Sequence, residues 1–156
     1  MFLAANPSYG YRAVHVIVHI LGKLVEIQVR SSLQHLWAEL SEKLSDVVDP
    51  RIKYGGGADW VRKMLSTISK SIRSHEELET STLVVESEFS ALEAQVVAKK
   101  KVLANQRFQA LREKLAPVLR SARHASRKAR RQLIESKKEL VEDLNTLIDQ
   151  ISKVKP

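Results

Sequence analysis

The stretch from Gly10 to Trp37 constrains the fold most, because it holds two strand-like runs followed by the start of a helix. The runs extend over 11–20 and 24–30 and are rich in Val, Ile and aromatic residues, as strands are. Three residues separate the runs, so a tight hairpin is expected. In a two-residue loop, Gly22-Lys23 suits a type II′ turn, because glycine at its first position takes a positive φ without penalty.

Side-chain alternation divides this hairpin into an apolar face and a polar face. Odd-numbered residues of the first run share a face with even-numbered residues of the second. The apolar face is expected to pack on helices. The polar face is either the wet side of an antiparallel sheet or a ligand site. The apolar set is Val14, Val16, Val18, Ile20, Val25, Ile27 and Val29, and the polar set is Tyr11, His15, His19, Glu26, Gln28 and Arg30.

A helix is expected to follow the hairpin, with Ser31 or Ser32 as N-cap and an end near Asp46. Its leucines recur at helical spacing and form an apolar stripe. Trp37 lies on this stripe and is interpreted as a core residue. His35 lies off the stripe, so it is either a solvated helix residue or part of a site.

Three motifs in this stretch, GYRAVH, VEIQVR and LQHLWAELSEKL, resemble the second half of the RelA/SpoT nucleotidyltransferase domain, the (p)ppGpp synthetase. The resemblance covers residues 8–57 and is closest to the small, synthetase-only members of the family. Those enzymes are GTP pyrophosphokinases of the stringent response, which transfer pyrophosphate from ATP to the 3′-hydroxyl of GDP or GTP. The resemblance implies that 1–57 is the C-terminal half of such a domain and that 58–156 is a helical, basic extension.

The resemblance also implies a role for each matching residue. Tyr11 matches the tyrosine that stacks on guanine, a contact worth about 1–3 kcal/mol. His15 matches a histidine that helps to hold the acceptor nucleotide. Glu26 matches the catalytic carboxylate that coordinates Mg²⁺ and activates the 3′-hydroxyl, and Mg²⁺ prefers such oxygen ligands. Gln28, Arg30 and His35 are expected to line the same nucleotide-binding face.

Family members place an ATP-binding loop and an aspartate-bearing strand before the first motif, whereas nine residues precede it here. Pyrophosphoryl transfer requires both nucleotides to be positioned and the phosphate charge to be neutralised. We therefore expect a truncated or degenerate synthetase that is inactive or impaired alone. Two alternatives stay open: a tRNA 3′-end pyrophosphokinase toxin of the same family, and a non-catalytic module for guanine-nucleotide or RNA binding or for oligomerisation.

The remaining chain is expected to be helical after a glycine-rich segment. Arg51 or Lys53 in that segment is either a phosphate contact or part of a slack loop. Helices are expected over 59–75 and 83–116, with a break or kink at Pro117 and a last helix ending near Ser152. The last two helices form either an internal antiparallel hairpin or a dimerisation element. The fold class is α+β, with a partial mixed sheet packed on helices and long C-terminal helices.

Charge is concentrated between Lys99 and Arg131, where twelve Lys or Arg residues face one acid, Glu113. This density indicates an anionic partner, which is RNA, the acidic part of another protein, or nucleotide phosphates. Because the segment has few aromatic residues, RNA would be bound through its backbone rather than by base stacking. The chain has no cysteine and no apolar run long enough to span a membrane. A cytoplasmic protein, with a homo-oligomer as one option, is therefore expected.

Overall fold

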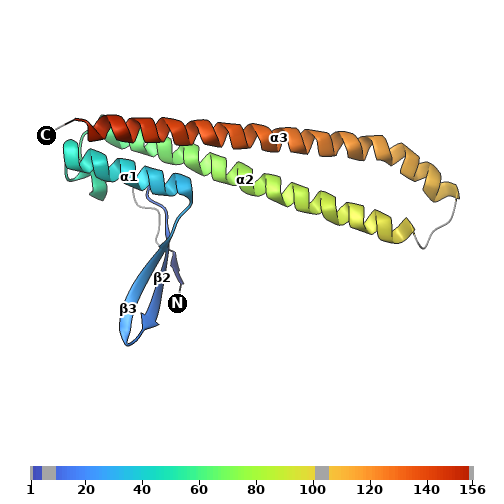
Figure 1. Ribbon diagram of the computed structural model, residues 1–156, viewed down its shortest axis with the longest axis horizontal. Coiled ribbons are helices and arrows are strands. Elements are labelled where there is room, and N and C mark those ends of the chain that lie inside the picture. Colours follow the sequence, from blue (N-terminus) through green and yellow to red (C-terminus); the bar gives the residue numbers. More distant parts are fainter. Residues whose placement is uncertain (1, 5–9, 101–105, 155–156) are drawn as a thin grey trace. The chain divides into compact units, whose positions relative to one another are not determined.

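The structure is a computed structural model that describes residues 2–4, 10–100 and 106–154. It confirms the α+β class, with strands followed by long helices (Figure 1). The chain divides into two compact units, one holding the chain up to Ser74 and from Lys138 onward, the other holding His75–Lys137. The elements are β1 (Phe2–Ala4), β2 (Val14–Ile20), β3 (Lys23–Val29), α1 (Ser32–Val47), the 3-10 helix η1 (Ile52–Tyr54), α2 (Asp59–Lys100) and α3 (Gln106–Ser152).

The β2–β3 hairpin turns one residue earlier than predicted. Its two-residue loop is Leu21-Gly22 rather than Gly22-Lys23, and φ is 50° at Leu21 and 78° at Gly22. Two positive φ values are typical of a type I′ turn, whose twist matches that of the paired strands. His15 lies opposite Gln28 in the resulting register. The two predicted faces are preserved, because moving the loop by one residue shifts the pairing by two.

The sheet is antiparallel rather than mixed among the described strands, in the order β1-β2-β3. Its apolar face is largely open, and the prediction that helices cover it is wrong for the described part of the chain. The core instead lies among the helices, whose stripes bury each other. Exposed members of the apolar face are Val14, Ile20, Val25, Ile27 and Val29.

Helix α1 begins as predicted and contributes much of the core of the first unit. Ser31 is the N-cap: its hydroxyl accepts from the Gln34 backbone N–H, and the Gln34 side chain accepts from the Ser31 backbone N–H. Trp37 is buried, as predicted, and its indole N–H donates to the Leu65 carbonyl at 2.9 Å. The buried apolar cluster is Leu33, Trp37, Ala38, Leu40, Leu44, Ile52, Val61, Leu65, Ile72, Leu144 and Ile148.

The long helices are divided differently from the prediction. Helix α2 joins the expected helix 59–75 to the first part of the expected helix 83–116, and the last part of that helix, from Gln106, belongs to α3. Residues 101–105 of the expected helix lie outside the described residues. The expected interruption at 76–82 is absent: this polar segment continues the helix, and hydroxyls within it donate to carbonyls four residues earlier, as from Thr80 to Glu76. Pro117 lies inside α3 and does not end it. A proline removes one backbone donor, and the helix-forming sequence on both sides keeps the rest of the helix intact.

In the second unit, α2 and α3 pair antiparallel through three ion pairs. Glu79 contacts Lys137 at 2.9 Å, Glu86 contacts Arg130 at 2.8 Å, and Glu93 contacts Arg123 at 2.5 Å. Successive partners are seven residues apart on both helices, which is the heptad spacing of a coiled coil. The internal hairpin is therefore present, while the 57/58 domain boundary stays a prediction.

Candidate functional site

Tyr11 lies at the centre of a polar network on the hairpin. Its hydroxyl accepts from Arg30 Nη2 at 2.8 Å and donates to Gln28 Oε1 at 3.4 Å. Arg30 also donates to Gln28, and its Cζ lies 5.0 Å from the centroid of the Tyr11 ring. This is the geometry of a cation–π contact. The aromatic ring is thus held in place by two predicted site residues.

His15 and Glu26 form the second part of this polar face. His15 Nδ1 lies 2.5 Å from Glu26 Oε1, and the two side chains are 19% and 52% exposed. The carboxylate is therefore oriented by an imidazole and still open to solvent. His15 Nε2 is buried and makes no hydrogen bond to the described residues. When Nδ1 carries the proton and donates to Glu26, Nε2 is an acceptor.

His35 joins the network through a shallow cavity of about 530 Å³. It lies in the first turn of α1, shortly after β3, which carries Gln28 and ends just before Arg30. Tyr11 hydrogen-bonds to both Gln28 and Arg30, which line this cavity. His15 and Glu26 do not line it. The cavity is lined by Gln28, Arg30, Ser31, Ser32 and His35.

Both neighbours of Tyr11 are bonded to α2, Gly10 through its backbone carbonyl and Arg12 through its side chain. Ser69 Oγ donates to the Gly10 carbonyl at 2.8 Å, and Arg12 Nη2 donates to the Ser69 carbonyl at 3.2 Å. The ring of Tyr11 lies 6.5 Å from the ring of buried Trp37. Tyr11 precedes β2, which begins at Val14 rather than at residue 11 as predicted, and one residue of α2, Ser69, fixes the segment that carries the tyrosine.

A larger cavity of about 810 Å³ also borders Tyr11. Four of its lining residues are cationic, and two are acidic, namely Glu42 and Asp59. Sequence reasoning did not assign three of these cations. The sequence could have predicted part of this cationic group, since Lys63 and Lys70 are seven residues apart and so lie on one face of α2. The cationic lining residues are Lys53, Arg62, Lys63 and Lys70.

The two basic residues of the glycine-rich segment have different surroundings. Arg51 is held by the Asp49 carboxylate, with Nη2 to Oδ2 at 2.7 Å, and the same arginine holds the Asp49 pKa below its ordinary value. Lys53 instead lines the larger cavity. Arg51 is thus paired with Asp49, and Lys53 is the basic residue of this segment that an anion in the cavity can contact.

The predicted Mg²⁺ ligand set is small. Glu26 supplies one carboxylate, and the described residues contain no cluster of three or more His, Asp or Glu side chains that encloses a metal. Mg²⁺ commonly binds one or two carboxylates together with substrate phosphates and waters. Glu26 fits such a shared site, in which the nucleotide completes the coordination.

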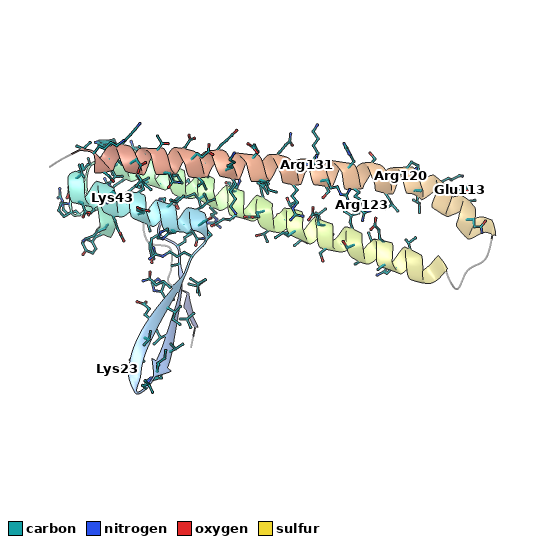
Figure 2. All side chains as sticks on the ribbon, viewed as in Figure 1. Lys23, Lys43, Glu113, Arg120, Arg123 and Arg131 are labelled. Atoms are coloured by element: carbon teal, nitrogen blue, oxygen red, sulfur yellow. The ribbon has the colours of Figure 1, made fainter. Side chains whose placement is uncertain are left out.

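The basic segment is described in part, since 101–105 lie outside the described residues. Two of its arginines, Arg123 and Arg130, are paired with glutamates of α2. Arg120, Arg127 and Arg131 follow one another at intervals of seven and four residues, which places them on one face of α3. Figure 2 shows Arg120, Arg123 and Arg131 along this helix.

Comparisons with known proteins identify no family and no activity. The chain is 46% identical over 52 residues to uncharacterized proteins of Mycobacterium tuberculosis and Mycobacterium bovis. The match covers 33% of this chain and 19% of each relative, so it spans about a fifth of the length of these curated relatives. No family model and no solved structure matches. Among the described residues, none of the helices combines the length and apolarity needed to cross a bilayer.

Proposed function

We propose that the hairpin and α1 form the acceptor-nucleotide half-site of a RelA/SpoT-type (p)ppGpp synthetase. The complete protein transfers pyrophosphate from ATP to the 3′-hydroxyl of GDP or GTP, in the cytoplasm, and the segment described here is impaired or inactive alone. The proposal rests on one observation. Tyr11, Gln28 and Arg30 hydrogen-bond to one another, and His15 contacts Glu26. The rings of Tyr11 and His15 lie 6.1 Å apart, so the two groups are neighbours, as a site requires and an ordinary wet sheet face does not.

The chemistry assigned to this face divides between base and ribose. Tyr11 offers its ring to the guanine, while Arg30 and Gln28 hold the phenol in position. Glu26 receives the 3′-hydroxyl proton, and His15 orients the carboxylate through its 2.5 Å contact. Bound Mg²⁺ would neutralise phosphate charge at Glu26. The 5′-phosphates extend toward the cavity cations Lys53, Lys63 and Lys70. Arg62, which also lines the cavity, is paired with Asp59.

The test is equilibrium binding of GDP and ADP to the full chain, with and without Mg²⁺. GDP is expected to bind more tightly than ADP, and Mg²⁺ should strengthen GDP binding. Glu26→Gln should remove the Mg²⁺ effect and leave metal-free GDP binding intact, because the amide keeps the shape and loses the charge. Glu88→Gln, an acid of the second unit, is the matched control. Equal affinity for GDP and ADP, or no binding of either, would overturn the proposal.

A tRNA acceptor is the second candidate, and the arginine row on α3 favours it. Contacts between cations and phosphates release counterions, so binding weakens steeply with salt. If tRNA is the substrate, the chain should retain tRNA with a strong salt dependence, and Arg127→Gln should reduce that slope by roughly one unit. Binding that does not respond to salt or to this substitution argues against tRNA.

A further inference from the structure

The large cavity of about 810 Å³ extends along one face of α2. The α2 residues that line it recur every three or four positions, which is the spacing of a single helix face. From the first to the last of them the helix rises about 16 Å. The cavity can therefore hold an elongated ligand. The α2 residues that line it are Asp59, Arg62, Lys63, Ser66, Thr67 and Lys70.

Tyr11 borders one end of this cavity. The Gly10 carbonyl accepts from the Ser69 hydroxyl at 2.8 Å, so the tyrosine lies beside the turn of α2 that also carries Lys70. A base stacked on Tyr11 is therefore bound at this end. The rest of the cavity extends toward the start of α2, so a 5′-phosphate chain placed in it runs in that direction.

The opposite end of the cavity carries two more lysines. Lys63 lies seven residues before Lys70, about 10 Å closer to the start of α2. Lys53 belongs to η1, which packs against the residues that lead into α2, because a Cβ at Gly57 would lie 2.8 Å from Ile52 Cγ1. The lysines thus follow one another along the cavity, with Lys70 beside the base and Lys63 and Lys53 beyond it.

These three lysines are accessible to an anion. Their side chains are exposed, and the described residues form no ion pair with Lys63 or Lys70. The acids of the cavity offset the lysines only in part. Asp59 is paired with Arg62, and Glu42 is the other lining acid, so a net positive charge faces the ligand.

We propose that the acceptor nucleotide is the 5′-triphosphate, GTP, and that Lys63 and Lys53 select it over GDP by contacting its third phosphate. Since the base is assigned to Tyr11 by the proposed function, this selection rests on that function. The phosphate chain of GDP ends nearer to Lys70, whereas a third phosphate carries negative charge toward the other two lysines. Charge-assisted contacts of this kind are stronger than neutral hydrogen bonds.

The test is isothermal titration calorimetry of the full chain with GDP, GTP, ADP and ATP. Metal-free buffer keeps Mg²⁺ from competing with the lysines for the phosphates, and the 5′-phosphates take no part in transfer to the 3′-hydroxyl, so binding alone reports the selection. GTP should bind about 10-fold tighter than GDP, the gain from one charge-assisted contact. Lys63→Gln should remove this gain and leave GDP affinity unchanged. Lys70→Gln should weaken both nucleotides by a similar factor.

Lys23→Gln is the matched control. Lys23 is an exposed lysine at the start of β3, in the same unit, and does not line the cavity (Figure 2). Its replacement removes the same charge and should change neither affinity. Far-UV circular dichroism checks that each variant keeps its helices.

The titrations separate failure of this selection from failure of the proposed function. If GDP binds more tightly than ADP but GTP binds no more tightly than GDP, the selection is wrong and the proposed function stands. The same holds if Lys63→Gln weakens both guanine nucleotides equally. ATP binding as tight as that of GTP would assign the cavity to a donor triphosphate and also overturn the selection. If GDP binds no more tightly than ADP, both proposals fail together.

Discussion

Replacing Gly10 by alanine should destabilise the protein more than the same replacement at Gly22. Both glycines have positive φ, 95° at Gly10 and 78° at Gly22, so alanine at either position strains the backbone by about 1–2 kcal/mol. Their surroundings differ. A Cβ at Gly10 would lie 3.0 Å from Ser69 Cβ and 3.1 Å from a ring carbon of Trp37, whereas a Cβ at Gly22 meets nothing within 4 Å.

The difference between the two variants isolates the steric cost. Both Ser69 and Trp37 are buried, so the added methyl group is an overpacking change worth about 1–3 kcal/mol. For a chain of this size, that corresponds to a melting temperature lower by about 2–12 °C in Gly10→Ala than in Gly22→Ala. A shift of the backbone at residue 10 would also move Tyr11, so Gly10→Ala should weaken GDP binding as well.

The assay is thermal and urea unfolding followed by tryptophan fluorescence. Trp37 is buried and bonded to the Leu65 carbonyl, while Trp60 is exposed, so a Trp60→Phe background makes Trp37 the reporter. Equal unfolding midpoints for the two alanine variants would show that Gly10 does not pack closely on Ser69 and Trp37. The anchoring of Tyr11 through α2 would then be refuted.

Two further predictions concern the site and the loop. Tyr11→Ala should weaken GDP binding roughly 5- to 150-fold by calorimetry, the equivalent of about 1–3 kcal/mol of stacking. Tyr11→Phe keeps the ring, loses the bond from Arg30 and should change affinity much less; an alanine variant that binds as wild type would exclude stacking. Asp49→Asn should remove a stabilisation that depends on pH. The Asp49 pKa is lowered by the hydrogen bonds from Arg51, so the wild-type advantage in melting temperature should be complete at neutral pH. It should decline as the pH falls below the ordinary value of 3.8 and disappear below the lowered folded-state pKa. An advantage that persists at the most acidic pH would contradict this.

The helices show where local sequence signals succeed and fail. The N-cap at Ser31 and the stripe that buries Trp37 follow from neighbouring residues, so they were predictable. The continuity of α2 through 76–82 was not, because that polar segment is supported by partners distant in sequence, such as the pairing of Glu79 with Lys137. The same heptad positions hold Ile72 and Leu144 in the first unit, where they are buried. The same heptad position is therefore apolar in the first unit and charged in the second. Hydrophobic periodicity alone predicts that the helix ends where this change occurs.

The hairpin shows why site residues can be predicted even when a turn is not. The predicted loop was wrong by one residue, yet His15 and Glu26 still meet. The face on which a residue lies depends only on whether the two residue numbers of a cross-strand pair add up to an odd or an even total. Moving the loop by one residue changes that total by two, so every side chain stays on its predicted face. The large cavity beside Tyr11 was not predictable in this way, since it collects residues from α1, η1 and α2 that only tertiary packing brings together. Residues on one hairpin can therefore be assigned to a face from the sequence, whereas the cations that line the large cavity are brought together only by the fold.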